Sequence, residues 1–266
     1  MRAITRRTAA IHRRPAPATI GQEPMSPLWT PLLDIRDLPQ RSVARSAAAV
    51  AKSLGSGLTL GRAGMTEDVL QGYATAAADL VVRFEQVSSA QLYEPVADLL
   101  PSRASAIVDI GAGTGRDAAW LADKGHEVVA VEPVGELRHA GMTLHRSERI
   151  EWLNDRLPDL RDLRSRKRRF DCVLLSAVWQ HLHNDERRIA MHSLGDLTAR
   201  GGLLIMSLRH GPGEPSRRVY ETRAEDTIDA ALRTGFKLIR ERRADSIQDA
   251  NRTSGVHWTW LAFGMP

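Results

Sequence analysis

The chain has 266 residues, of which 42% are hydrophobic and 26% are charged, so it contains enough apolar side chains for one substantial core. Its single cysteine, Cys172, excludes an intrachain disulfide, and no run reaches the roughly 20 apolar residues that a membrane-spanning helix requires. We therefore expect a cytoplasmic protein that does not enter a membrane.

Positive charge is concentrated at the beginning of the chain. Residues 1–65 contain ten Lys and Arg against three acids, a net charge of +7, whereas the other 27 bases and 29 acids give the rest a net charge of −2. Six prolines interrupt the first forty positions, and glycines recur between 55 and 64. These features predict a disordered basic extension over residues 1–64 and one domain over residues 65–266.

Three alternatives for the extension remain open. It could precede a true start at Met65, or its Arg-rich and acid-free first 22 residues could be an organellar transit peptide. It could also be a basic arm that binds RNA or DNA.

From Met65 onward, helical and extended patterns follow in order. The spacing predicts helices over 66–85 and 90–100, the second closed by Pro101, and further helices over 116–124 and 186–197. Short apolar runs that read as strands lie at 106–110, 127–131, 150–153, 171–175 and 203–208. Unbroken apolar strands that alternate with helices indicate a doubly wound α/β fold with a parallel sheet covered on both faces.

The C-terminal part differs from this pattern. Two extended segments, 236–242 and 256–263, follow each other without a helix between them, so we expect them to pair antiparallel. The sequence thus predicts seven strands in a mostly parallel sheet with an antiparallel C-terminal strand. Alternation places Trp258 and Trp260 on one face of the last strand, where we interpret them as core residues.

A glycine-rich loop follows the first predicted strand. In the sequence VDIGAGTG (108–115), Gly111 and Gly113 allow the backbone to approach a ligand that a Cβ atom would repel. Glu132 lies 21 residues after Gly111, at the end of the next strand, where a carboxylate in a doubly wound fold bonds both ribose hydroxyls of a nucleoside. We therefore expect a nucleoside cofactor. A dinucleotide loop would require glycine at position 116, where Arg116 stands, which makes a dehydrogenase the weaker interpretation.

The motifs VDIGAGTG (108–115), Glu132-Pro133 and Asn154-Asp155 resemble, in order, the cofactor motifs of class I S-adenosylmethionine-dependent methyltransferases, over about residues 66–263. The segments LLSAVWQHL (174–182) and GGLLIMSLRHG (201–211) resemble a bacterial branch of this family, whose methyl acceptors are largely unassigned. The resemblance implies a Rossmann-like fold with S-adenosylmethionine as the cofactor.

The same resemblance implies roles for individual residues. An acid before the glycines orients the methionine end of the cofactor, the glycine backbone passes beneath it, and acids after the next two strands bind the ribose and the adenine amine. The cofactor-binding residues expected in this chain are Tyr73, Arg83, Asp109, Gly111, Ala112, Gly113, Glu132, Pro133, Asn154, Asp155 and Ser176. Among these, Tyr73 and Arg83 lie on a helix that similar methyltransferases lay over the cofactor as a lid; the alternative for Tyr73 is simple packing on the sheet.

The acceptor should lie beyond the carboxyl ends of the fourth and fifth strands, next to residues 176–181 and 209–211. His181 and His210 are candidate bases because histidine titrates near neutrality, Trp179 is a candidate wall of the acceptor site, and Arg209 could bind an acidic acceptor. Alternatively, each histidine caps a helix or bonds a carbonyl group. We expect no metal site, because alternation sends His181 and His183 to different sides.

These features favour direct in-line methyl transfer to a small-molecule acceptor. The alternative is a methyltransferase-like protein that binds the cofactor for regulation without turnover. Nucleic-acid or protein methylation ranks below both, because residues 176–179 lack the Asn/Asp-Pro-Pro-aromatic signature of enzymes that methylate nucleic-acid amino groups. The sequence does not specify an oligomeric state.

Overall fold

The computed structural model describes residues 67–266. The basic extension expected over residues 1–64, with its alternatives, lies outside the described residues. Within residues 67–266, every helix is too short or too polar to cross a lipid bilayer.

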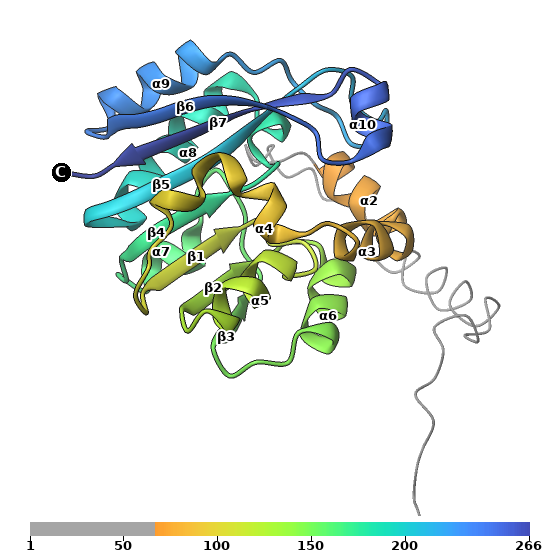
Figure 1. The fold of residues 1–266 in the computed structure, drawn as a ribbon, viewed down its shortest axis with the longest axis horizontal. Helices are drawn as coiled ribbons and strands as arrows, with labels where there is room; N and C mark the ends of the chain where they lie inside the picture. The colour runs from red at the N-terminus through yellow and green to blue at the C-terminus, as the bar shows by residue number, and fades with distance from the viewer. Residues whose placement is uncertain (1–66) are drawn as a thin grey trace, which may run out of the picture. The chain divides into compact units, whose positions relative to one another are not determined.

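The described residues form the expected Rossmann-like α/β fold around a seven-stranded sheet (Figure 1). The strand order is β3-β2-β1-β4-β5-β7-β6, with β1 to β5 parallel and β7 antiparallel to both of its neighbours. The strands are β1 Ala106–Ile110, β2 Glu127–Val131, β3 Ile150–Leu153, β4 Phe170–Leu175, β5 Thr198–His210, β6 Lys237–Asp245 and β7 His257–Gly264. The prediction of a mostly parallel sheet with an antiparallel C-terminal strand is confirmed.

Helices cover both faces of this sheet, and others gather at the ends of the parallel strands (Figure 1). The α-helices are α2 Glu67–Thr75, α3 Ala77–Glu85, α4 Ser89–Leu92, α5 Arg116–Asp123, α6 Gly135–Leu144, α7 Arg161–Ser165, α8 Asn184–Leu197, α9 Ala224–Arg233 and α10 Asp249–Thr253. Two 3-10 helices are η2 Glu94–Leu99 and η3 Trp179–His181. In Figure 1, α2, α3 and α10 lie at the same end of the sheet.

Alternation along the strands produces two separate cores. In β1, Val108 and Ile110 belong to a cluster that includes side chains of α8, whereas Ile107 belongs to a second cluster with Leu121 of α5. Successive side chains of a strand point to opposite faces, so an unbroken apolar strand requires cover on both sides. This arrangement leaves the carboxyl ends of the strands free to form a site.

Three predicted elements differ from the structure. The helix expected over 66–85 is interrupted at Ala76 and forms α2 and α3. The helix expected over 90–100 becomes a 3-10 helix after Leu92, because Pro95 has no N–H group to continue the α-helical hydrogen bonding. The connection between the last two strands, expected without a helix, contains the short helix α10.

Candidate functional site

A cavity of about 750 Å³ opens at the carboxyl ends of β1, β2, β4 and β5. Residues of α2 and α3, of the segment 212–219 and of α10 also line it, together with residues of α4, η2, β6 and β7. The structure brings to this cavity most of the residues expected from the sequence: Tyr73, Arg83, Asp109, Gly111, Ala112, Gly113, Glu132, Pro133, Ser176, His181 and Arg209.

The glycine loop turns the chain from β1 into α5 beneath this cavity. Gly111 and Gly113 have φ values of 75° and 59°, which non-glycine residues adopt only with strain. A Cβ atom on Gly111 would lie 2.3 Å from Cγ2 of Val178. The loop therefore requires glycine at 111 for its own backbone and packing, apart from any ligand that approaches it.

Glu132 joins the end of β2 to the glycine loop. Its carboxylate accepts hydrogen bonds from the backbone N–H groups of Gly113 (2.7 Å) and Val134 (2.8 Å). Burial raises the pKa of Glu132 to about 7, although these two hydrogen bonds favour the charged form. Each carboxylate oxygen can accept a further hydrogen bond, so Glu132 can also bind hydroxyl groups of a ligand.

Asp109 is the last polar residue of β1 and is only 2% exposed. Its Oδ2 atom has no hydrogen-bond partner within residues 67–266. Burial, followed by the nearby charge of Asp117, raises the pKa of Asp109 well above its usual range. A buried acceptor without a partner is costly, so the geometry suits a ligand that brings a hydrogen-bond donor or a positive charge to Asp109.

Tyr73 and His181 form a hydrogen-bonded pair across the cavity. The Nδ1 atom of His181 lies 2.7 Å from the carbonyl oxygen of Arg218, which can only accept, so Nδ1 carries the hydrogen. Nε2 is then the acceptor, and the Tyr73 hydroxyl donates to it at 2.8 Å. Burial lowers the pKa of His181 to about 4 and raises that of Tyr73 to about 12, so both groups are neutral at pH 7.

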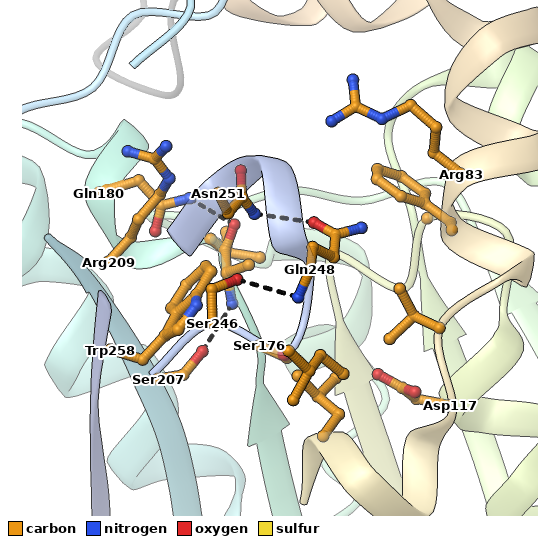
Figure 2. A pocket seen from close by; sticks show the side chains of 18 of the residues that line it. Arg83, Asp117, Ser176, Gln180, Ser207, Arg209, Ser246, Gln248, Asn251 and Trp258 are labelled. Atoms are coloured by element: carbon orange, nitrogen blue, oxygen red, sulfur yellow. Dashed lines mark hydrogen bonds between the residues drawn. The ribbon is translucent and has the colours of Figure 1, made fainter. Parts of the chain in front are cut away.

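Polar side chains of α10 and of the strand ends line another part of the cavity (Figure 2). The Asn251 amide donates to Gln248 at 2.7 Å, and the Ser207 hydroxyl accepts from the backbone N–H of Ala177 at 2.9 Å. Trp258 also lines this part and is partly exposed, so its interpretation as a core residue was incomplete. Gln248 and Asn251 were not among the expected site residues, because α10 and the residue that precedes it were expected to form a loop.

Asn154 and Asp155 do not line the cavity, in contrast to their expected contact with the adenine. Asn154 is exposed, and Asp155 accepts hydrogen bonds from the backbone N–H groups of Arg156 (2.8 Å) and Leu163 (2.9 Å). Both oxygens of Asp155 are therefore used to hold the turn that leads into α7.

Trp179 and His210 also lie outside the cavity lining. Trp179 is fully buried in the core, where its indole N–H donates to Thr227 at 3.2 Å, so it cannot form a wall of the acceptor site. His210 stacks on His257 and is hydrogen-bonded to Thr259 at 2.9 Å. Neither Trp179 nor His210 therefore lies where its expected role in the acceptor site would place it.

Gln180 is a cavity residue that the sequence did not single out. It is 3% exposed, and its amide nitrogen donates to the carbonyl oxygen of Ala177 at 2.6 Å and lies 3.3 Å from Nε2 of His181. Its amide oxygen has no partner within residues 67–266. Two nearby acceptors thus fix the orientation of the amide and leave its oxygen available to a ligand.

Residues 107–202 match the family model described as a methyltransferase domain. The structure is similar to a TehB-like S-adenosylmethionine-dependent methyltransferase from Corynebacterium glutamicum, with 18% identity, 72% of this chain and 99% of that chain covered, and a TM-score of 0.51. It is also similar to 1,6-didemethyltoxoflavin-N1-methyltransferase from Burkholderia thailandensis (19% identity, 79% and 92% covered, TM-score 0.50) and to the cyclase SpnF (13%, 80% and 99%, TM-score 0.57). No curated protein matches the chain.

The fold is Rossmann-like, and its cavity lies at the carboxyl ends of the parallel strands, where doubly wound folds bind their ligands. Residues 107–202 thus match a methyltransferase domain within a fold that is similar to that of a TehB-like S-adenosylmethionine-dependent methyltransferase.

Proposed function

We propose that the protein methylates a small molecule held in the same cavity as the cofactor. The observation that carries this proposal is that one cavity of about 750 Å³ contains both the Asp109 and Glu132 carboxylates and the Tyr73–His181 pair. A pocket of this size, walled by α2, α3 and α10, suits a small ligand better than an extended nucleic acid or protein surface.

The residues present fit S-adenosylmethionine. The Glu132 carboxylate would bind the ribose hydroxyls, and the unpartnered Asp109 oxygen would face the positively charged methionine end. Arg83, exposed on α3 and without an ion pair in residues 67–266, would bind the carboxylate of the cofactor. Gly113 and Ala112 would pass beneath it, with Pro133 and Ser176 alongside.

When bound, the cofactor supplies a methyl group on a positively charged sulfur that leaves as a neutral thioether. The chain's main task is then to hold the acceptor in line with that methyl group and to exclude water. For an acceptor that loses a proton, the Tyr73 oxygen would receive it and the Tyr73 hydroxyl would pass its own proton to Nε2 of His181. This relay requires no covalent intermediate with the protein.

The compartment that we propose is the cytoplasm. Cys172 is buried within β4 and unpaired within the described residues, which is compatible with a reducing environment.

Calorimetric titration with S-adenosylmethionine tests the proposed site directly. We expect Glu132→Ala to raise the dissociation constant about tenfold or more, because it removes charged hydrogen bonds to the ligand. Glu127→Ala is the matched control, since Glu127 lies exposed at the other end of the same strand, and it should bind as the wild type does. Equal affinities of the two variants would contradict the placement of the cofactor.

Transfer of a labelled methyl group then tests the acceptor class. We expect label in small-molecule products and none in RNA, DNA or protein. Label in a macromolecule would contradict the proposal, and tight cofactor binding without transfer to any acceptor class would favour the non-catalytic alternative.

A further inference from the structure

Two arginine side chains flank the Tyr73–His181 pair inside the cavity. Arg209 lies at the end of β5, and Arg217 lies in the segment that follows β5. The guanidinium group of Arg217 lies 5.3 Å from the centre of the Tyr73 ring. Arg209, Arg217 and His181 all line this cavity, and both positive charges help to lower the pKa of His181.

Neither arginine forms an ion pair with an acid in residues 67–266. Arg209 donates one side-chain hydrogen bond within the described residues, to the carbonyl oxygen of Gly211 at 3.2 Å. By contrast, Arg116 in the same cavity forms two hydrogen bonds of 2.8 Å with Asp117. Arg116 is therefore paired with an acid, whereas Arg209 and Arg217, beside His181, are not paired with an acid in residues 67–266.

The groups around these arginines do not neutralise them. His181 and Tyr73 are both uncharged at pH 7. Glu214 is exposed and lines the same cavity, and its charge acts on Arg209, but the two side chains do not form an ion pair. Two partly buried guanidinium groups without an ion-pair partner in residues 67–266 are unfavourable unless a ligand supplies negative charge.

We propose that the methyl acceptor carries an anionic group, a carboxylate or a phosphate, which Arg209 and Arg217 bind while its reacting atom faces the Tyr73–His181 pair. This inference rests on the proposed function, since it specifies the acceptor of the same site. Guanidinium groups bind both kinds of anion through paired hydrogen bonds, and two of them would fix the orientation of a small acceptor as well as its position.

The test measures binding of small anions to the full chain saturated with S-adenosylhomocysteine. The probes are benzoate and inorganic phosphate, with benzamide as the uncharged counterpart of benzoate, in a ligand-observed NMR titration. We expect one or both anions to bind more tightly than benzamide, and we expect R209Q and R217Q each to weaken that binding about tenfold. R233Q, in an exposed arginine at the end of α9, is the control and should bind as the wild type does. A preference for phosphate or for benzoate identifies the anion.

The inference is overturned if neither anion binds, if benzamide binds as well as benzoate, or if both variants retain wild-type affinity. Calorimetry with S-adenosylhomocysteine separates two other outcomes. Weaker cofactor binding in R209Q and R217Q would mean that these arginines hold the cofactor's own carboxylate, which also overturns the inference. Absence of cofactor binding in the wild type would instead overturn the proposed function. R217Q changes a residue outside the strands and helices, so it tests the idea even if R209Q does not fold.

Discussion

His181 is held in one tautomer by its surroundings. The Arg218 carbonyl fixes the hydrogen on Nδ1, and the Tyr73 hydroxyl occupies the lone pair on Nε2. Burial then lowers the pKa of this imidazole to about 4, so it stays neutral over the whole physiological range. A neutral, oriented imidazole can accept a proton at once, without first losing one to solvent.

Tyr73→Phe removes the hydroxyl that links the acceptor to His181. For an acceptor that loses a proton, we expect kcat to fall about 100-fold with little change in cofactor affinity, because general-base catalysis contributes factors of this size. Tyr220→Phe is the control, since Tyr220 packs edge-on against His183 outside the cavity. Unchanged kcat in Tyr73→Phe would contradict the relay.

The pH dependence of turnover gives a second test of His181. Since its pKa is about 4, kcat at saturating cofactor should stay level on acidification until about pH 5 and fall only below it. His181→Gln can still accept a hydrogen bond from Tyr73 but cannot take a proton, so it should lose most of its activity. An inflection near pH 6.5 in the wild type would mean that His181 is not the group that accepts the proton.

The raised pKa of Glu132 makes the stability of the cofactor-free protein depend on pH. Its folded pKa of about 7 lies above the ordinary value of 4.5, so the unfolded state releases the proton first as the pH rises. The free energy of unfolding should therefore fall between about pH 4.5 and pH 7 in the cofactor-free protein.

Glu132→Gln cannot ionise and should escape this loss. The stability of the variant relative to the wild type should increase across the same interval by an amount on the order of 3 kcal/mol, which urea unfolding at pH 4.5 and pH 7.5 would measure. Glu127→Gln, in an exposed glutamate, should show no such increase. Parallel pH curves for the wild type and Glu132→Gln would contradict the buried, protonated carboxyl group.

At the level of elements, the end of α3 is held by one contact to the glycine loop, one to the first residue of α5 and one to the residue after α6. Glu85 accepts a hydrogen bond from Thr114 and is paired with His145, and the Arg116 side chain donates to the carbonyl oxygen of Phe84 at 3.0 Å. The end of the lid helix is thus attached to the loop beneath the cofactor site. Cofactor binding and the position of the lid should therefore depend on each other.

Glu85→Ala should loosen this attachment. We expect faster hydrogen exchange of the α3 amides and a dissociation constant for S-adenosylmethionine that rises about threefold to tenfold, the size expected for a partly exposed charged hydrogen bond. Asp79→Ala, in an exposed acid on the same helix, is the control. Unchanged exchange and affinity in Glu85→Ala would mean that the lid is positioned by packing alone.

The sequence predicted the elements whose pattern depends on burial. Val108 and Ile110 reveal β1 because both faces of that strand are covered, and Gly111 reveals the loop because its backbone needs a positive φ. Helix α10 was missed because its five residues bury no side chain and so leave no periodic signal. The position of a residue along the chain also did not predict the direction of its side chain. Trp179 follows β4 as expected, yet within the 3-10 helix its side chain is buried in the core.

The cofactor side of the site was more predictable than the acceptor side for a related reason. Asp109 and Glu132 lie at strand ends, whose place in the sheet follows from the α/β pattern. Tyr73, Arg217 and Gln248 reach the cavity from three segments far apart in the sequence. Their meeting depends on tertiary packing of the lid helix, of the segment after β5 and of α10, which no local pattern encodes.

In the whole molecule, the parallel strands bring their carboxyl ends to one edge, and the lid helices and α10 lie at that edge (Figure 1). The result is one cavity with two chemically different halves. The buried acids Asp109 and Glu132 lie on the side of β1 and β2, where Arg116 is paired with Asp117, and two arginines without an ion pair among the described residues lie beside His181. This division allows a positively charged cofactor and a negatively charged acceptor to meet without crossing each other's binding groups.

A crystal structure of the full chain with S-adenosylhomocysteine bound would test this arrangement most directly. We expect the ribose hydroxyls within hydrogen-bond distance of the Glu132 carboxylate, the amino-acid end beside Asp109, and the sulfur facing Tyr73 and His181. A nucleoside bound away from Glu132, or a sulfur facing away from the Tyr73–His181 pair, would contradict it.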